Sequence, residues 1–285
     1  MRVYSNFDLT NYNSYRLKAV CNKAYFPESE NDLIELYQSR KDYVLLGSGH
    51  NVILSKKYYE EEFIIFNGNF DKVIIDSEKG FIDAEAGIMM DRISEIACQN
   101  GLSGVEVFYD IPSSLGGAVV MNAGASGEEI KDVLVKVRYL DLADMEIKEI
   151  FKEEMGFEYR NSFFQKFKDK IVLRAWLKLA AKDKSLIKEK METIKAQRWA
   201  KQPKEYPNAG SVFKRPPGYF VGAIMEELGL KGYTVGGAKI SEKHGGFIVN
   251  FNQATGQDIL TIITEVKRQV MEKYHVDLKI EQRII

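Results

Sequence analysis

The sequence predicts an α+β protein of two domains, and three features of its 285 residues support this fold class. Helix-like and strand-like segments alternate through residues 29–100, and residues 133–180 are rich in strand-forming side chains. A long charged helix then starts near residue 183 and runs into Pro203, which is typical of a connection between domains. The chain also exceeds the usual size of a single domain. We therefore expect a domain boundary at the charged helix.

The first hundred residues contain two predicted helices with strands between them. In the first helix, residues 29–40, Ser29 and Asp32 have the spacing of a capping box. Strand-like patterns follow in DYVLLG, FIIFN and KVIID, with the turn GSGHN after the first of them. A second helix over residues 89–100 should end at Gly101, because glycine adopts the left-handed conformation at little cost.

The rest of the chain also contains both predicted helices and predicted strands. Strand-like runs occur in VLVKVRYLD, EIKEIF and IVLRAWLKLA, and a helix in GYFVGAIMEELGL precedes the glycine-rich strand region GGAKISEKHGGFIVNF. The last helix opens at Thr255, and its apolar residues recur three or four apart and predict a core-facing stripe: Leu260, Ile263, Val266, Val270 and Tyr274. The final segment, VDLKIEQRII, alternates as a half-exposed strand does, which puts Glu281 on the solvated face.

Charge and cysteine content exclude several classes of protein. Lysine and arginine number 40 against 41 acidic residues, a net charge of −1, which argues against nucleic-acid binding. Cys21 and Cys98 are too few for a disulfide framework or a metal cluster, and we expect both to be buried. No secretory signal and no run of about 18 apolar residues is found. We expect a soluble, cytoplasmic protein without a metal, a membrane partner or an obligate protein partner.

Two segments of small residues are candidates for a cofactor site. In LGSGHNV, residues 46–52, glycines let backbone N–H groups approach an anion, or simply form a tight turn. The segment DIPSSLGGAVVMNAGASG, residues 110–127, has one charge in eighteen residues, which fits backbone pressed against a flat or phosphorylated ligand or against other backbone. Neither completes a dinucleotide fingerprint or a P-loop. Together they favour a dinucleotide bound outside a Rossmann fold.

Two polar side chains stand out in the remaining sequence. Ser211 in NAGSVFKR is open to interpretation as a nucleophile, a phosphate contact or a turn residue. Arg160 in YRNSFF is suited to bind a carboxylate through two hydrogen bonds, or to cover a neighbouring ring. A serine hydrolase is excluded, because no G-x-S-x-G motif surrounds Ser211. The scattered histidines and cysteines have no metal-ligand spacing.

Seven motifs, taken in order over nearly the whole chain, resemble one family, the UDP-N-acetylenolpyruvoylglucosamine reductases. They are LGSGHN, IPSSLGGAVVMNAGASG, YRNSFF, KQPKEYPNAGSVFKRPPGYF, ELGLKGY, GGAKISEKHGGFIVN and the terminal KIEQR. The segment GSVFKRPPGYF and the lack of a long insertion before the last helix resemble the shorter, type II form. The resemblance implies an NADPH-dependent flavoenzyme that reduces UDP-N-acetylglucosamine enolpyruvate to UDP-N-acetylmuramate for peptidoglycan synthesis.

The resemblance also implies a fold and a cofactor site. A two-lobed FAD-binding domain of the vanillyl-alcohol-oxidase (PCMH) type would span residues 1–182, with lobes of about residues 1–64 and 65–182. An α/β substrate-binding domain would follow at residues 183–285, and its terminal strand would contribute to the active site. Two loops would bind FAD non-covalently: Gly47, Ser48, Gly49, His50 and Asn51 in the first, and Pro112, Ser114, Gly116, Gly117, Asn122, Ala123 and Gly124 in the second.

Catalytic roles follow from the same resemblance. After hydride transfer, Arg160 and Glu281 would stabilise the negative charge that builds on the carboxylate side, and Ser211 would protonate the carbon beside it. We expect these three residues to converge in one cleft. Contacts to the nucleotide sugar are expected from Lys201, Tyr206, Lys214, Arg215 and Tyr219.

The chain departs from the family pattern in two places. His50 stands where the family has serine, and Asp110 and Ser113 replace two glycines beside the flavin. An inward-pointing Asp110 would weaken FAD binding, so we expect it to point away or to accept backbone N–H bonds. Two other functions stay open: an FAD-linked oxidase of the same superfamily, suggested by GSGH, and a divergent nucleotide-sugar binder without flavin chemistry.

Overall fold

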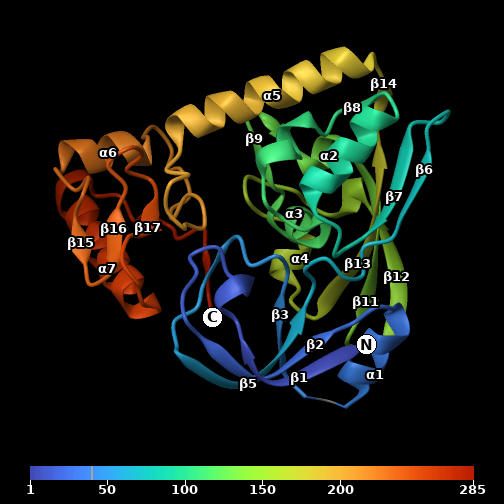
Figure 1. Ribbon diagram of the computed structural model, residues 1–285, viewed down its shortest axis with the longest axis horizontal. Helices are drawn as coiled ribbons and strands as arrows, with labels where there is room; N and C mark the ends of the chain where they lie inside the picture. Colours follow the sequence, from blue (N-terminus) through green and yellow to red (C-terminus); the bar gives the residue numbers. More distant parts are fainter. Residues whose placement is uncertain (40) are drawn as a thin grey trace. The chain divides into compact units, whose positions relative to one another are not determined.

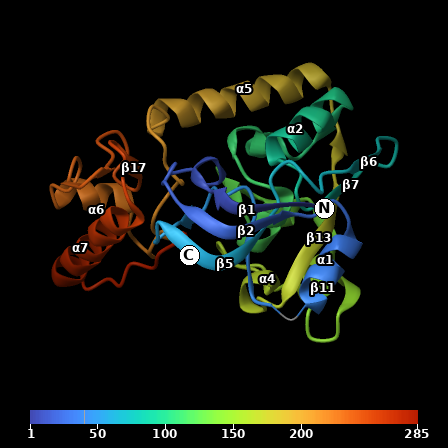
Figure 2. The same cartoon turned by 60° about the horizontal axis from the view of Figure 1, so that its bottom comes forward.

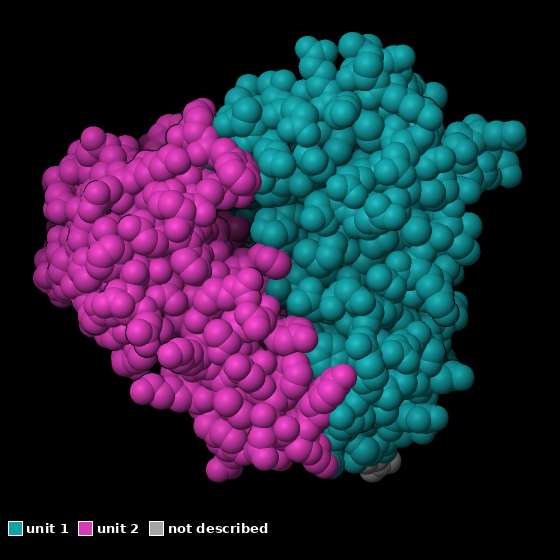
Figure 3. Space-filling model, in the orientation of Figure 1, with its two compact units in different colours: residues 1–3, 25–48, 63–198 teal, residues 4–24, 49–62, 199–285 magenta. Residues whose placement is uncertain are grey.

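The computed structural model describes residues 1–39 and 41–285. Its chain divides into two compact units, which Figure 3 shows in separate colours. Unit 1 comprises residues 1–3, 25–48 and 63–198, and unit 2 comprises residues 4–24, 49–62 and 199–285. Helices and strands occur in both units, as the predicted fold class requires.

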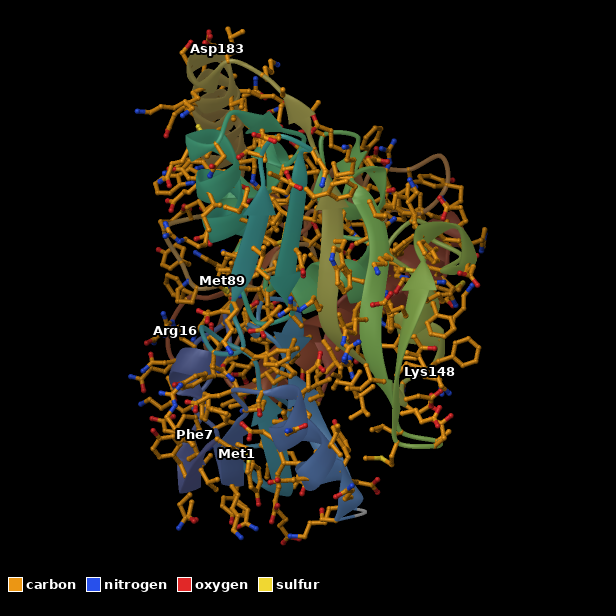
Figure 4. All side chains as sticks on the ribbon, turned by 90° about the vertical axis from the view of Figure 1, so that its right-hand side faces the viewer. Met1, Phe7, Arg16, Met89, Lys148 and Asp183 are labelled. Atoms are coloured by element: carbon orange, nitrogen blue, oxygen red, sulfur yellow. The ribbon has the colours of Figure 1, made fainter. Side chains whose placement is uncertain are left out.

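A five-stranded antiparallel sheet forms the centre of unit 1 (Figure 1), with the order β12-β11-β13-β7-β6. Its strands are β6 (Val73–Asp76), β7 (Phe81–Glu85), β11 (Leu134–Asp141), β12 (Glu146–Phe151) and β13 (Lys170–Lys178). The strand-like runs predicted for this region are therefore confirmed. Figure 4 labels Lys148 on the edge strand β12, where its ammonium lies 2.8 Å from the carboxylate of Asp141, which is 5 % exposed.

Short elements surround this sheet. They are α1 (Glu30–Gln38), β3 (Tyr43–Leu46), α2 (Met90–Gln99), β8 (Leu102–Ser103), η2 (Glu106–Asp110), α3 (Leu115–Met121), β9 (Gly124–Ala125), β10 (Glu128–Glu129), η3 (Ile130–Asp132), η4 (Lys152–Glu154), α4 (Phe163–Lys166) and β14 (Ala180–Ala181). The helix predicted over residues 89–100 ends as expected before Gly101, at φ +68°. Helices α3 and α4 pack against β13.

The predicted capping box of α1 is half correct. Ser29 accepts a hydrogen bond from the backbone N–H of Asp32 (3.2 Å), as expected of an N-cap. The Asp32 carboxylate instead accepts from the N–H of Glu28 (2.8 Å), one residue before the cap. The helix was predicted to residue 40, and that last residue lies outside the described residues.

The long helix α5 (Lys184–Lys201) has a buried face in addition to its charged one. Ile187 and Met191 are buried, and Ile194 packs against the hydrophobic core of unit 1. Figures 1 and 2 show α5 along the side of unit 1 that carries α2. Its buried residues recur at helical spacing, which explains why α5 belongs to unit 1 as far as Arg198. The boundary predicted between the FAD-binding and substrate-binding domains, between residues 182 and 183, differs from the end of unit 1 at Arg198. The assignment of these two functions to the two parts of the chain stays a prediction.

Unit 2 combines a three-stranded antiparallel sheet with two helices. The sheet order is β15 (Thr234–Val235), β16 (Ala238–Ile240), β17 (Ile248–Asn250), and the helices are α6 (Val221–Glu227) and α7 (Gly256–Tyr274). Helix α7 packs on β15 and β16. Thr255 and Asp258 form the capping box at its start. The predicted stripe is correct at Ile263, Val266 and Val270 but wrong at Leu260 and Tyr274, because the helix turns Ile259 and Ile262 inward instead.

The end of the chain is less regular than the predicted strand. Only β18 (Arg283–Ile284) is a strand, and it pairs in parallel with β4 (Val52–Ile53). Ile284 is 48 % exposed whereas Gln282 is 4 % exposed, so the apolar and polar alternation does not continue to the end. The polar Gln282 is buried because its amide is hydrogen-bonded on both sides, as described below.

The remaining strands and the cysteines complete the fold. One further sheet has the order β1 (Arg2–Asp8), β2 (Val20–Phe26), β5 (Tyr58–Ile65), β3, and η1 (Thr10–Tyr12) follows β1. Cys21 is buried as predicted, and burial raises the pKa of its thiol to about 11. Cys98 is only partly buried, contrary to the prediction, because it lies near the end of α2 beside the start of α5. In residues 1–39 and 41–285 no helix combines the length and apolar character needed to cross a bilayer.

Candidate functional site

In unit 1, the turn after β3 meets the segment of small residues. The backbone N–H of Ser114 donates to the hydroxyl oxygen of Ser48 (3.0 Å). A Cβ atom at Gly47 would lie 2.8 Å from the Ser114 hydroxyl oxygen, so a larger residue here would displace the Ser114 side chain. Among the described residues, no hydrogen bond from the N–H groups of Gly47 and Ser48 is found. Two predicted cofactor segments therefore come together here and present donors for an acceptor group.

Several glycines of the second segment serve backbone packing. The N–H of Gly116 donates to the carbonyl of Ala86 (2.8 Å), and a Cβ at Gly116 would lie 3.0 Å from the Ala86 side chain. A Cβ at Gly124 would lie 2.1 Å from the carbonyl oxygen of Glu128 across the β9–β10 hairpin. At Gly117 the N–H donates to the Ser114 hydroxyl, which caps α3 (3.4 Å). Close packing therefore accounts for Gly116 and Gly124, and leaves the start of the segment as the part suited to a ligand.

Arg160 is held against the same segment of unit 1. Its guanidinium donates to the carbonyl oxygens of Asn122 (3.3 Å) and Gly124 (2.8 Å). Asn122 ends α3 in the left-handed conformation, at φ +44°, and its side-chain amide donates to the carbonyl of Glu158 (3.0 Å). Arg160 also has a positive φ of +53°, an uncommon conformation for a residue with a side chain. The segment that carries Arg160 and the segment that carries Asn122 and Gly124 thus hold each other in place. The Arg160 side chain is therefore positioned without a ligand.

In unit 2, the continuation of the first loop binds the end of the chain. Gly49 has φ +73°, and a Cβ there would lie 2.0 Å from the carbonyl oxygen of Tyr12. The side-chain amide of Asn51 donates to the carbonyl of Glu281 (3.1 Å), and the N–H of Arg283 donates to the carbonyl of Asn51 (2.9 Å). The loop residue Asn51 and the predicted catalytic residue Glu281 are therefore direct neighbours.

Ser211 and Glu281 lie on paired segments of unit 2. Phe213 and Ile280 form an antiparallel bridge, and the N–H of Glu281 donates to the carbonyl of Val212 (2.8 Å). On its other side Ser211 is bridged to Phe247. The Ser211 side chain is exposed and that of Glu281 is partly buried. The structure thus brings these two predicted residues together through their main chains, while Arg160 belongs to unit 1.

A buried glutamine that the sequence analysis missed supports this pairing. The Gln282 amide nitrogen donates to the carbonyls of Ala209 (3.0 Å) and Gly210 (3.2 Å), just before Ser211. Its amide oxygen accepts from the hydroxyl of Tyr15 (2.9 Å). Burial raises the pKa of Tyr15, which keeps this hydroxyl a donor. The sequence signal was available, because Gln282 interrupts an apolar alternation.

The turn beside Ser211 depends on a histidine. The His244 Nδ1 atom accepts from the N–H of Gly246 (3.1 Å), and the ring packs against Phe247 with centroids 4.8 Å apart. Burial lowers the pKa of His244, which favours the neutral ring that this acceptor role needs. The carbonyl of Gly246 then accepts from the N–H of Val212 (3.0 Å). His244 thus has a structural role in this loop.

Known proteins with this sequence pattern settle the family. A model described as FAD binding domain matches residues 23–150, and one described as UDP-N-acetylenolpyruvoylglucosamine reductase, C-terminal domain, matches residues 202–285. The UDP-N-acetylenolpyruvoylglucosamine reductase of Francisella tularensis is 41 % identical over 280 residues, which cover 97 % of this chain and 98 % of the relative. The chain belongs to the UDP-N-acetylenolpyruvoylglucosamine reductase family.

Further members of this family agree over the full length. The UDP-N-acetylenolpyruvoylglucosamine reductase of Caldanaerobacter subterraneus is 41 % identical over 288 residues, covering 100 % of this chain and 94 % of the relative. The crystal structure of the UDP-N-acetylenolpyruvylglucosamine reductase of Thermus caldophilus has a TM-score of 0.84 and 33 % identity, covering 100 % of this chain and 99 % of that chain. The predicted family, the α+β fold class with an FAD-binding domain, and the oxidoreductase class are confirmed.

The residues of this reductase-family chain fit an FAD pyrophosphate. The N–H groups of Gly47 and Ser48 are donors without an acceptor among the described residues, and a diphosphate supplies such acceptors. Of the remaining predicted FAD contacts, Ser114 and Asn122 are buried, Ala123 and His50 are partly buried, and Pro112 is exposed. Their contacts with the cofactor stay predictions.

The five predicted sugar-binding residues of unit 2 have different neighbours. The Arg215 guanidinium lies 3.9 Å from the ring centroid of Phe220, and Tyr219 packs edge-on against Tyr274 at 5.7 Å. Tyr206 packs against Phe251 at 5.7 Å. The N–H of Lys214 donates to the carbonyl of Lys279 (2.8 Å), and Lys201 ends α5 with an exposed side chain. These contacts give no common location for the five, and their substrate role stays a prediction.

Proposed function

We propose that this chain catalyses the NADPH-dependent reduction of UDP-N-acetylglucosamine enolpyruvate to UDP-N-acetylmuramate, a step of peptidoglycan precursor synthesis. Membership of the reductase family supports the reaction. Among the contacts of the chain, the pairing that joins the Ser211 segment to the Glu281 segment carries the proposal furthest. This main-chain pairing supports the proposal because it brings the two segments that carry Ser211 and Glu281 together although they lie far apart in the sequence.

The reaction adds one hydride and one proton across the carbon–carbon double bond of the enolpyruvyl group. FAD, when bound, supplies the ring that accepts hydride from NADPH and passes it to the substrate. We assign the binding of this cofactor to the loop Gly47–Asn51 and to the start of the segment Pro112–Gly124. The remaining requirements are a site for the charge that develops on the substrate and a donor for the proton.

Arg160 meets the first requirement in this proposal. Hydride addition to the terminal carbon pushes negative charge toward the substrate carboxylate, and a fixed guanidinium stabilises that charge. Its bonds to the carbonyls of Asn122 and Gly124 hold the side chain in place, so little reorganisation is needed during the reaction. A preorganised donor of this kind contributes about 3 kcal/mol to the transition state.

Ser211 meets the second requirement. Its hydroxyl would donate a proton to the carbon beside the carboxylate, and Glu281 would orient the donor or the substrate. A positioned acid typically accelerates such a step by about 10²- to 10⁴-fold. The N–H of Val212 donates to the carbonyl of Gly246 (3.0 Å) and its carbonyl accepts from the N–H of Glu281 (2.8 Å), and these two bonds fix the backbone next to Ser211.

A cytoplasmic location belongs to the same proposal. The thiols of Cys21 and Cys98 are unpaired, as is usual in a reducing compartment. NADPH and a UDP-sugar are the proposed small-molecule partners.

The proposal is tested by following NADPH oxidation and product formation together in the absence of oxygen. Without the UDP-sugar we expect NADPH to be consumed only up to one equivalent per flavin. When UDP-N-acetylglucosamine enolpyruvate is present, consumption should continue, with one UDP-N-acetylmuramate formed per NADPH. Oxidation of NADPH that needs oxygen and ignores the UDP-sugar would identify an oxidase instead. Binding of the UDP-sugar by a colourless protein that oxidises no NADPH would identify a non-catalytic binder.

A further inference from the structure

Asp110 and Arg198 form an ion pair at the entrance to the proposed cofactor segment. The Nε atom of Arg198 lies 2.8 Å from the Asp110 carboxylate, and a second guanidinium nitrogen donates to the Asp110 carbonyl (3.3 Å). The side chain of Arg198 is 18 % exposed and that of Asp110 is 9 % exposed. One arginine thus binds both the side chain and the main chain of the aspartate, and both residues belong to unit 1.

This pair is the last of three charged contacts from one face of α5 to η2. Lys190 lies 3.4 Å from the carboxylate of Glu106, which is 1 % exposed. The Lys195 ammonium lies 5.1 Å from the ring centroid of Tyr109. Burial raises the pKa of Glu106, but hydrogen bonds from Ser103 and backbone N–H groups and the charge of Lys190 outweigh it, so its pKa stays below the ordinary value. Charged residues of α5 therefore hold η2 along its length.

The position of Asp110 gives its charge a consequence for cofactor binding. Residue 110 ends η2, and Ser114 follows four positions later; its N–H donates to the Ser48 hydroxyl oxygen and its side chain caps α3. The pyrophosphate that we assign to this region carries negative charge of its own. The charge of Asp110, four positions before this cap and partly desolvated, would oppose binding of that negative group, because burial weakens screening by water.

We propose that Arg198 is a positioning residue for the cofactor, which compensates the charge of Asp110 and holds it away from the pyrophosphate. The inference rests on the proposed binding of FAD by unit 1. Arg198 acts through Asp110 rather than by contact with the cofactor. The ion pair with Arg198 then makes an acidic residue at this position compatible with the cofactor segment.

The proposal predicts an asymmetry between the two members of the pair. Removing the cation in Arg198→Gln leaves a partly buried carboxylate and should raise the dissociation constant of FAD by about tenfold or more. Removing the anion in Asp110→Asn leaves no repulsion between this residue and the pyrophosphate, and it should change the dissociation constant of FAD by less than about threefold. The double variant should bind FAD nearly as well as Asp110→Asn, because the repulsive group is gone.

A purely structural clamp predicts a different pattern. If the pair only fastened α5 to η2, either single substitution would remove the same contact and weaken FAD binding equally. The double variant would then bind no better than Arg198→Gln. Arg198→Lys supplies a further check, because lysine keeps the charge but loses the second hydrogen bond, so most of the affinity should remain.

The experiment is a titration of each apoprotein with FAD, followed by the quenching of flavin fluorescence and repeated at 0.1 M and 1 M salt. The screening length falls from about 10 Å to about 3 Å over this range, so the gap between Arg198→Gln and the natural protein should narrow. Lys190→Gln is the matched control, since it removes a cation from the same face of α5 near Glu106, and it should leave the FAD dissociation constant unchanged.

Unfolding of each apoprotein identifies variants that lose FAD because they lose structure. If Arg198→Gln does not fold, the ranking of Arg198→Lys, Asp110→Asn and the double variant decides instead. Failure of the natural protein to bind FAD would contradict the proposed function. FAD binding by the natural protein with Asp110→Asn as weak as Arg198→Gln, or with the double variant no stronger than Arg198→Gln, would overturn the role of Arg198 alone.

Discussion

Replacing Gln282 by leucine removes the amide that joins the last segment of the chain to the residues before Ser211. The amide makes three hydrogen bonds, to the carbonyls of Ala209 and Gly210 and from the hydroxyl of Tyr15. A hydrogen bond contributes about 1 kcal/mol net, so we expect a loss of about 3 kcal/mol in the free energy of unfolding. Leucine fills a similar volume, and the loss therefore reports the hydrogen bonds rather than a cavity.

A second variant measures how much of this stability loss comes from the hydrogen bond between Tyr15 and Gln282. Tyr15→Phe removes one of the three bonds and should cost about 1 kcal/mol. Because both changes delete the same bond, the double variant should lose about 1 kcal/mol less than the sum of the singles. Leucine at Gln257, which is exposed at the start of α7, is the control and should change stability little.

The assay is urea unfolding of the apoproteins, combined with the rate at which the substrate reoxidises reduced flavin. Gln282→Leu should slow this rate and leave the reduction of flavin by NADPH unchanged, because the substitution loosens the Ser211 segment. A stability loss below about 1 kcal/mol would refute the claim that the amide fastens the two segments. Equal slowing of both half-reactions would refute the link to Ser211.

Three further predictions concern other parts of the chain. Ser211→Ala should slow substrate reduction by about 10²- to 10⁴-fold and spare flavin reduction by NADPH; unchanged turnover would remove its role as proton donor. Gly49→Ala should lower the free energy of unfolding by more than about 2 kcal/mol, because the new Cβ meets the Tyr12 carbonyl oxygen at 2.0 Å. Gly68→Ala is the control: it has a similar φ of +72° with nothing within 4 Å, and it should lower the free energy of unfolding by about 1 kcal/mol. Equal losses of the two variants in urea unfolding would contradict the steric argument. Hydrogen bonds from lysines lower the pKa of Asp141, so its contribution to stability is present above about pH 4 and lost as pH falls through the depressed pKa. Asp141→Asn should therefore be less stable at neutral pH and lose less stability on acidification, and a parallel pH profile in unfolding experiments would contradict this.

Local patterns predicted the elements whose structure depends on local interactions. The capping residues Thr255 and Asp258 fixed the start of α7, and Gly101 fixed the end of α2, because caps act between residues a few positions apart. The ordered motifs predicted the family, which the full-length relatives confirm.

Distant contacts were beyond the reach of periodicity. Alternation placed Glu281 on a solvated face, but the terminal segment bonds instead to Val212 and Asn51, far away in sequence. The charge of α5 concealed its buried residues Ile187 and Met191, because a helix with one apolar stripe and many charges has the composition of a linker. The partner of Asp110 was likewise unpredictable, since Arg198 approaches it from another element.

The proposed reaction is tested most directly by its second half in a single turnover. Protein reduced by one equivalent of NADPH, without oxygen, is mixed with UDP-N-acetylglucosamine enolpyruvate while the flavin absorbance is followed. The account predicts that the oxidised flavin colour returns, with one UDP-N-acetylmuramate formed per flavin. Flavin that stays reduced until oxygen is admitted would contradict it.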